Sequence, residues 1–207
     1  MFEIEDHPTL DAQAIWARAN TQLGDLDSSQ AVLDGLSLDA PALLSSSDEV
    51  RKQVRQMLRF HGYKPSGRGK PASEYLLNSA AEGPLQPINL AVDICNGVSL
   101  HSGLPISVID VDKAVKPFQI AVATAEMRYV FNRSGQEMTL QGLPCLFDSQ
   151  GPCANAVKDS QRTKTDETTQ NTLTIIWGVR GLPQQTIRTR DWYLELLSRS
   201  GFEVTAS

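Results

Sequence analysis

The chain has 207 residues, of which 41% are hydrophobic and 21% are charged, and its formal net charge is -5 at pH 7. These values exclude a disordered chain and suit a single domain with a proper hydrophobic core. No apolar run approaches the roughly 18 residues that a membrane span needs, and the acidic start MFEIEDHP does not resemble a signal peptide. The sequence therefore predicts a protein of the cytoplasm without a membrane partner.

The three cysteines, Cys95, Cys145 and Cys153, are an odd number and are widely spaced. Without a CxxC pair they favour neither a disulfide framework nor a zinc site. We expect free thiols in a reducing compartment, with no metal and no cofactor.

Charge is distributed unevenly along the chain. Residues 1–50 contain ten acidic residues and only one basic residue, whereas residues 51–70 contain seven basic residues and no acidic one. Local charge, not net charge, determines where a polyanion docks. The predicted RNA-binding residues are Arg51, Arg55, Arg59, Lys64, Arg68 and Lys70.

The first 47 residues are expected to form an N-terminal helical extension and an acidic connection. Apolar spacing favours an amphipathic helix over residues 10–23, with Gly24 as its stop, followed by an irregular stretch over 24–47. Residues 48–207 would then be the core of a single domain that spans 1–207.

A second helix is predicted over residues 48–61. Ser47 suits its cap, and Val50, Val54, Met57 and Leu58 suit its buried face. Arg51, Arg55 and Arg59 step by four along another face. This stripe either contacts RNA or is an ordinary solvated helix surface.

The loop KPSGRGK, residues 64–70, leads into a helix with Pro71 near its first position. Glycine-exposed N–H groups, a helix N-terminus and full positive charges together suit a phosphate or carboxylate. The loop is not a Walker motif, because GxxxxGK[ST] is absent. A flexible basic turn remains the alternative.

The segment 87–110 is predicted to be a helix between Pro87 and Gly103, followed by a buried strand that ends at Asp110. Asn89, Asp93 and Asn96 recur at helical spacing as a polar stripe that a core helix does not need. We expect them around a pocket. For Asp93 the alternative is a buried carboxylate that organises backbone N–H groups.

This segment carries a family resemblance through the spacing V-D-x-x-N-x-V-x-L-x-x-G-x-P and the following strand: Val92, Asp93, Asn96, Val98, Leu100, Gly103, Pro105 and Asp110. It resembles the B3/B4 module of the phenylalanyl-tRNA synthetase beta subunit, as does GQEMTLQG at residues 135–142. The resemblance covers roughly residues 51–188 and leaves no room for a synthetic domain. It implies a freestanding module that binds tRNA, not DNA, and hydrolyses wrongly charged tRNA.

After Asp110 the chain is predicted to be mostly strand, with runs at 118–124, 128–131, 136–140 and 173–177 and a turn at 132–135. A loop over 178–190 and a final helix over 191–200 follow. Helices before strands favour an α+β fold, with mixed β-sheets and helices packed on them, as in the B3/B4 module.

The polar segment 151–169 is either a functional loop or a solvated turn. In the family, the corresponding loop has paired glycines followed by an acidic residue that is important for editing. Here Gln161 falls near that position and Asp159 is the nearest carboxylate. The family's preference for tyrosine is therefore not transferred, and we expect a different amino acid.

The leading hypothesis is a deacylase that positions water against the activated aminoacyl ester. It fits a sequence without GxSxG or HExxH, and Cys95 and His101 lie on nearly opposite helix faces. Asp93, Asn89 and Asp159 are the candidate catalytic residues. The candidate substrate-binding residues are Asn96, Ser99, Lys158, Arg162, Thr163, Lys164 and Thr165. The alternatives are a non-catalytic module that binds tRNA or an amino acid, and a small-molecule amidase or esterase.

Overall fold

The computed structural model describes residues 2–206. One sheet is antiparallel and has the order β10-β2-β9-β3. Its strands are β2 (Leu10–Arg18), β3 (Ile106–Asp110), β9 (Asn171–Val179) and β10 (Glu203–Ala206).

The second four-stranded sheet has the order β1-β4-β7-β8 and is mixed, because β1 runs parallel to β4. Its strands are β1 (Phe2–Ile4), β4 (Phe118–Val122), β7 (Pro144–Asp148) and β8 (Gly151–Asn155). Strands β5 (Arg128–Val130) and β6 (Glu137–Thr139) form a separate hairpin.

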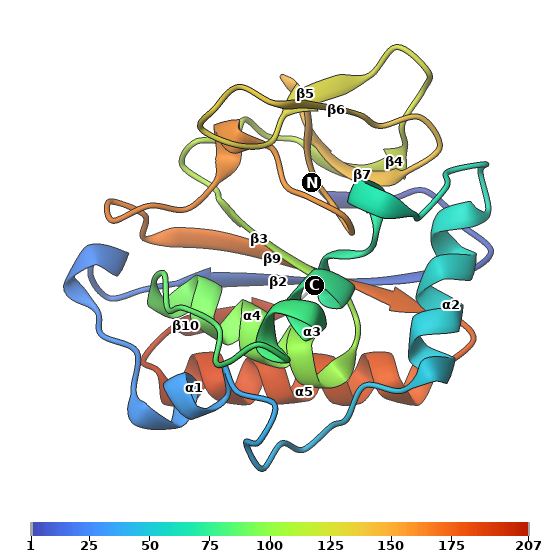
Figure 1. The fold of residues 1–207 in the computed structure, drawn as a ribbon. Helices are drawn as coiled ribbons and strands as arrows, with labels where there is room; N and C mark the ends of the chain where they lie inside the picture. The colour runs from blue at the N-terminus through green and yellow to red at the C-terminus, as the bar shows by residue number, and fades with distance from the viewer. Residues whose placement is uncertain (1, 207) are drawn as a thin grey trace.

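The helices are α1 (Gln30–Asp34), α2 (Asp48–Arg59), α3 (Ala72–Ala80), α4 (Leu90–Ser102) and α5 (Pro183–Arg199). In Figure 1, α1, α3, α4 and α5 lie on one side of the antiparallel sheet, and the other strands lie on its opposite side. This arrangement confirms the predicted α+β class with mixed sheets and packed helices.

Strand β9 lies at the centre of the core. It pairs with β2 on one side and with β3 on the other, and only its first residue is not buried. Trp177 on this strand has no exposed surface, and its indole Nε1 donates to Ser107 Oγ on β3 at 2.9 Å. The apolar run LTIIW, predicted as a strand, is therefore covered on both faces.

The helix predicted over residues 10–23 is wrong, because residues 10–18 form strand β2. All nine residues of β2 face partners on β9, and four of them face β10 as well. Residues 1–47 thus supply strands to both large sheets, instead of a helical extension. Cross-strand pairing overrides the weak helical preference of this alanine-containing segment.

Helix α4 begins later than predicted. Asn89, not Pro87, stands at its start: Asn89 has an extended backbone and its side chain accepts a hydrogen bond from Val92 N at 3.1 Å. At the other end, Gly103 has φ of 74°, which confirms the predicted left-handed C-cap.

Other local predictions are mixed in outcome. Helix α2 has the predicted Ser47 cap and the predicted buried face, and the turn at 132–135 joins β5 to β6. The loop predicted over 178–190 is wrong, since α5 already begins at Pro183. The first five residues of the polar segment 151–169 form β8, a strand that the sequence did not reveal.

Within residues 2–206, no helix combines the length and apolar character that crossing a lipid bilayer requires.

Candidate functional site

A cavity of about 440 Å³ opens between α3, α4, β3 and the segment that follows β8. Its walls are mostly apolar and include Leu76, Val92, Cys95, Ile106, Val108 and Val157. Its polar side chains come mainly from the segment 158–165. An apolar enclosure with a few convergent polar groups is the usual form of a ligand site.

Five predicted site residues line this cavity: Asn96, Lys158, Asp159, Lys164 and Thr165. A sixth, Asn89, is joined to it, because its Nδ2 donates to Thr165 Oγ1 at 3.3 Å. The fold therefore brings together residues of α4 and of the segment after β8 that are about 70 positions apart in the sequence.

Two hydrogen bonds position the Asp159 carboxyl, and both end on its Oδ1 oxygen. Ser107 Oγ donates to Asp159 Oδ1 at 2.7 Å, and the backbone N–H of Asn155 donates to the same oxygen at 3.3 Å. No hydrogen bond from residues 2–206 ends on Oδ2, so this oxygen can accept one from a ligand. The Trp177 indole in turn fixes Ser107. Burial raises the pKa of Asp159 to about 7, against the opposing effects of Ser107 and Lys164. Such a carboxyl can exchange a proton near neutral pH.

Two lysines face the same cavity. Lys164 Nζ donates to the carbonyl oxygen of Phe131 at 2.6 Å, and burial lowers the pKa of this amine although Asp159 favours its charged form. Lys158 Nζ lies 4.2 Å from the centroid of the Phe131 ring. Burial, followed by the nearby charge of Arg68, lowers its pKa. Both ammonium groups are partly withdrawn from water, which strengthens their attraction for an anionic ligand.

Asp93 does not lie in this cavity. It is only 1% exposed, and its carboxylate accepts from Ser28 Oγ at 2.6 Å and from the backbone N–H of Ile88 at 2.7 Å. It borders a separate cavity of about 340 Å³ between α1, α4 and α5. The expected single polar stripe is therefore split, because Asn96 faces α3 while Asp93 faces α1. Asp93 fits the alternative of a buried carboxylate that organises backbone N–H groups.

Ser99 and Thr163, expected to bind substrate, are buried and have internal partners. Ser99 Oγ donates to Leu104 O at 2.7 Å at the end of α4, and Thr163 Oγ1 donates to Cys153 O at 3.3 Å. Neither lines the 440 Å³ cavity. These hydroxyls satisfy backbone carbonyls inside the fold.

Arg162 is also engaged inside the fold. Its Nη1 and Nη2 each lie 2.8 Å from an oxygen of Asp148, whose side chain has no exposed surface. This bidentate pair ties the segment after β8 to strand β7 and occupies the guanidinium that was expected to bind substrate.

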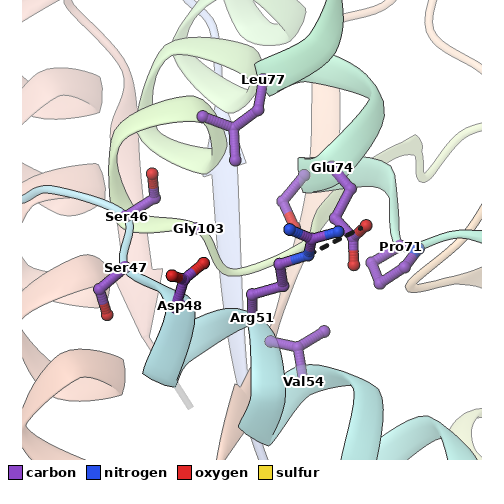
Figure 2. A pocket seen from close by; sticks show the side chains of 10 residues that line it. Ser46, Ser47, Asp48, Arg51, Val54, Pro71, Glu74, Leu77 and Gly103 are labelled. Atoms are coloured by element: carbon purple, nitrogen blue, oxygen red, sulfur yellow. Dashed lines mark ion pairs between the residues drawn. The ribbon is translucent and has the colours of Figure 1, made fainter.

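The basic region separates into paired and free side chains. Figure 2 shows Arg51 directed at Glu74 in a hollow of about 320 Å³ between the start of α2 and α3. Arg55 binds the same carboxylate through two hydrogen bonds of 2.6 and 2.7 Å. Arg59, Lys64 and Arg68 are exposed, and Lys70 is partly buried. The cations available to a polyanion are therefore mainly those of the 64–70 loop and Arg59.

Two residues of the site were missed in the sequence. Ser107 is the single hydroxyl residue in the apolar strand β3, and such an interruption could have indicated a role. Tyr75 lies on α3 just after the basic loop and lines the cavity. An exposed aromatic residue beside basic residues was the available signal.

Two further kinds of catalytic group are a bound metal ion and a reactive cysteine. Across the described part of the chain, no group of three or more His, Cys, Asp or Glu side chains is arranged to hold a metal ion. Cys95 lines the cavity, but burial raises the pKa of its thiol, so it is unsuited to nucleophilic attack.

Comparison with solved structures shows the same fold in an N-terminal fragment of the phenylalanyl-tRNA synthetase beta subunit from Pyrococcus horikoshii, with a TM-score of 0.54 and 12% sequence identity. The match covers 99% of this chain and 50% of that one, so the chain spans about half the length of the fragment. No curated protein sequence matches.

A family model for the B3/4 domain matches residues 64–201, about two thirds of the sequence. The matched range contains α3, α4, both large sheets apart from β1, β2 and β10, and every residue that lines the 440 Å³ cavity. The chain belongs to the B3/4 domain family.

Proposed function

We propose that this protein binds charged tRNA and hydrolyses the ester between the tRNA and a wrongly attached amino acid, acting in trans. The observation that carries this proposal is the meeting of Asp159, Lys164 and Asn96 in one largely apolar cavity of a B3/4 fold. An aminoacyl ester is already activated, so a positioned water and a stabilised oxyanion are sufficient for catalysis.

In the proposed reaction, water attacks the ester carbonyl while Asp159 Oδ2 accepts its proton. The water oxygen bonds to the carbonyl carbon, and the ammonium of Lys164 and the amide of Asn96 donate to the oxyanion. The bond to the ribose oxygen then breaks, and this oxygen takes the proton back from Asp159. The pKa of Asp159, raised by burial to about 7, suits both transfers.

The exposed cations of the 64–70 loop support the tRNA part of the proposal. Lys64 and Arg68 have no carboxylate partner among the ion pairs of residues 2–206, unlike Arg51 and Arg55. The loop lies beside the cavity, because the hydroxyl of Tyr75, which lines the cavity, donates to Gly67 O at 3.1 Å. Contacts of these cations with phosphate give affinity that falls steeply with salt.

The direct test is release of amino acid from a panel of mischarged tRNAs. We expect at least one ester to be lost faster with the protein than without it, and Asp159→Asn to abolish this gain. The matched control is Glu167→Gln, which removes an exposed carboxylate from the same segment. If no ester in the panel is hydrolysed faster, the deacylase proposal is refuted.

A non-catalytic module that binds tRNA or an amino acid is the second candidate. It is favoured by the lack of an activated nucleophile, since burial raises the pKa of the Cys95 thiol. Salt-dependent tRNA binding that is lost in Lys64→Glu and Arg68→Glu, but kept in Arg199→Glu on α5, would support it if ester hydrolysis is absent.

A further inference from the structure

Lys158, which lines the 440 Å³ cavity, carries its ammonium between two aromatic rings. Lys158 Nζ lies 4.2 Å from the centroid of Phe131, next to β5, and 5.8 Å from that of Tyr75, on α3. Tyr75 is 36% exposed, and its hydroxyl donates to Gly67 O at 3.1 Å. Two segments distant in the sequence thus present aromatic rings around one ammonium.

This ammonium has no anionic partner among residues 2–206. Among the interactions of residues 2–206, the side chain of Lys158 forms neither a hydrogen bond nor an ion pair, and its charged neighbours Arg68 and Lys164 are both cations. Other cations near the site are engaged: Arg162 with Asp148, and Lys164 with Phe131 O. Three donors of Lys158 are therefore available to an anion that approaches the rings.

The two rings and the neighbouring cations Lys158 and Arg68 together favour a ligand that has both an aromatic face and an anionic group. Aromatic faces stack on nucleobases irrespective of sequence, and ammonium and guanidinium groups bind phosphate. A nucleotide satisfies both requirements at once, whereas inorganic phosphate or an aliphatic amino acid satisfies only the requirement for negative charge.

We propose that Tyr75, Phe131 and Lys158 form the binding site for the terminal nucleotide of the tRNA, with its base against the rings and its phosphate on Lys158 and Arg68. This inference rests on the proposed function and adds the nucleotide contact to it. Lys158 moves from the Phe131 ring to the phosphate when the nucleotide binds, which frees the ring for the base. Because Lys158 and Asp159 are adjacent, the ester then lies at the entrance that leads to Asp159.

The test is binding, without hydrolysis, of the trinucleotide CCA and of AMP by calorimetry. We expect Lys158→Met, Tyr75→Ala and Phe131→Leu each to weaken CCA binding about tenfold, the effect of losing one stacking or phosphate contact. Tyr75→Phe, which keeps the ring, should stay within about twofold. Ribose 5-phosphate should bind more weakly than AMP, because it has no base.

A second cation–π pair supplies the matched control. Lys116 Nζ lies 5.8 Å from the centroid of the Trp16 ring, and Trp16 belongs to strand β2. Neither residue lines the 440 Å³ cavity, so Lys116→Met should leave CCA binding unchanged. Circular dichroism and thermal denaturation verify that each variant is folded. Lys158→Met removes the charge of a partly exposed side chain and keeps its length. If an aromatic variant does not fold, this variant alone still tests the nucleotide site.

The outcomes separate this inference from the deacylase proposal. Equal binding of CCA by Lys158→Met, Phe131→Leu and wild type, or equal binding of ribose 5-phosphate and AMP, overturns the nucleotide site even if esters are hydrolysed. Residue-dependent CCA binding without hydrolysis of any mischarged tRNA supports the nucleotide site and refutes the deacylase.

Discussion

Arg55 and Glu74 join helices α2 and α3 through two hydrogen bonds, from Nε to Oε1 at 2.6 Å and from Nη2 to Oε2 at 2.7 Å. The Glu74 side chain is 7% exposed, whereas that of Arg55 is 22% exposed. Arg55, the central arginine of the predicted RNA-binding stripe, is therefore engaged within the protein. The buried Glu74 carboxylate in turn depends on Arg55 for its two short hydrogen bonds.

Arg55→Ala should lower the free energy of unfolding by roughly 2 kcal/mol at pH 7, because it removes both short hydrogen bonds of the buried Glu74 carboxylate and leaves the 3.5 Å ion pair with Arg51. Urea denaturation measures the loss. Arg59→Ala, which removes an exposed arginine one turn further along α2, should change it by less than about 0.5 kcal/mol. Equal losses in the two variants would contradict a structural role for Arg55.

The effect of Arg55→Ala should also depend on pH. Burial raises the pKa of Glu74, but the hydrogen bonds from Arg55 and the charges of Arg55, Arg51 and Lys70 outweigh it and hold the pKa below the usual 4.5. Because the folded state favours the ionised form, the stabilisation is present above pH 4.5 and is lost as the pH falls through the folded-state pKa. The difference between wild type and Arg55→Ala should therefore shrink below pH 4.5.

Arg162→Ala should destabilise the protein by about 2–4 kcal/mol, since it strands the fully buried carboxylate of Asp148. Two backbone N–H groups, of Val115 and Gln150, still donate to Asp148. Arg162→Lys keeps the charge but loses the bidentate geometry, so its loss should be intermediate. Denaturation curves measure these changes. Loss of ligand affinity with unchanged stability would instead indicate the substrate role expected from the sequence.

Asn89→Ala should cost about 1 kcal/mol, the usual value for a helix N-cap, and Asn89→Asp should retain most of this stability. The aspartate can still accept from Val92 N, and the Thr165 hydroxyl, which accepts from Asn89 Nδ2 in the wild type, can donate to it instead. Thr165→Val removes this cavity contact and leaves the cap in place. Comparing the three variants in thermal denaturation and in the deacylation assay therefore separates the cap from the cavity contact. A deacylation defect in Thr165→Val alongside normal stability would assign a role to the Thr165 contact.

Deacylation should rise with pH and level off above about 7, since only ionised Asp159 accepts the proton of water. Asp159→Asn should remove both the activity and this pH dependence. A wild-type profile that is flat between pH 5.5 and 8.5 would exclude Asp159 as the base.

Stability gives an independent check on Asp159. Its pKa is raised from 3.8 to about 7, so between these values the folded state binds a proton that the unfolded chain does not. Wild-type stability should fall as the pH rises from about 4 to 7, and Asp159→Asn should be more stable than wild type at pH 8, by about 1–3 kcal/mol. The two proteins should converge near pH 4, and an equal difference at both pH values would contradict the raised pKa.

The sequence by itself determined those features whose causes lie within a few residues. The Ser47 cap, the left-handed Gly103, the 132–135 turn and the apolar run of β9 were all predictable, because capping, backbone sterics and burial periodicity act locally. The family resemblance and the α+β class followed from such motifs. The segment 151–169 was identified because a polar, charged run before an apolar strand is visible in the chain.

The tertiary structure decided which partner each residue meets. Residues 10–18 became strand β2 because β9 and β10 supply hydrogen bonds on both edges, and no local pattern indicates those partners. In the same way, Asp93 accepts a hydrogen bond from Ser28 and Arg162 forms an ion pair with Asp148, while Lys158 lies between two rings with no anionic partner in the described part of the chain. A charge becomes a structural link or a ligand contact according to what lies within a few ångströms of it, and that is set by segments distant in the sequence.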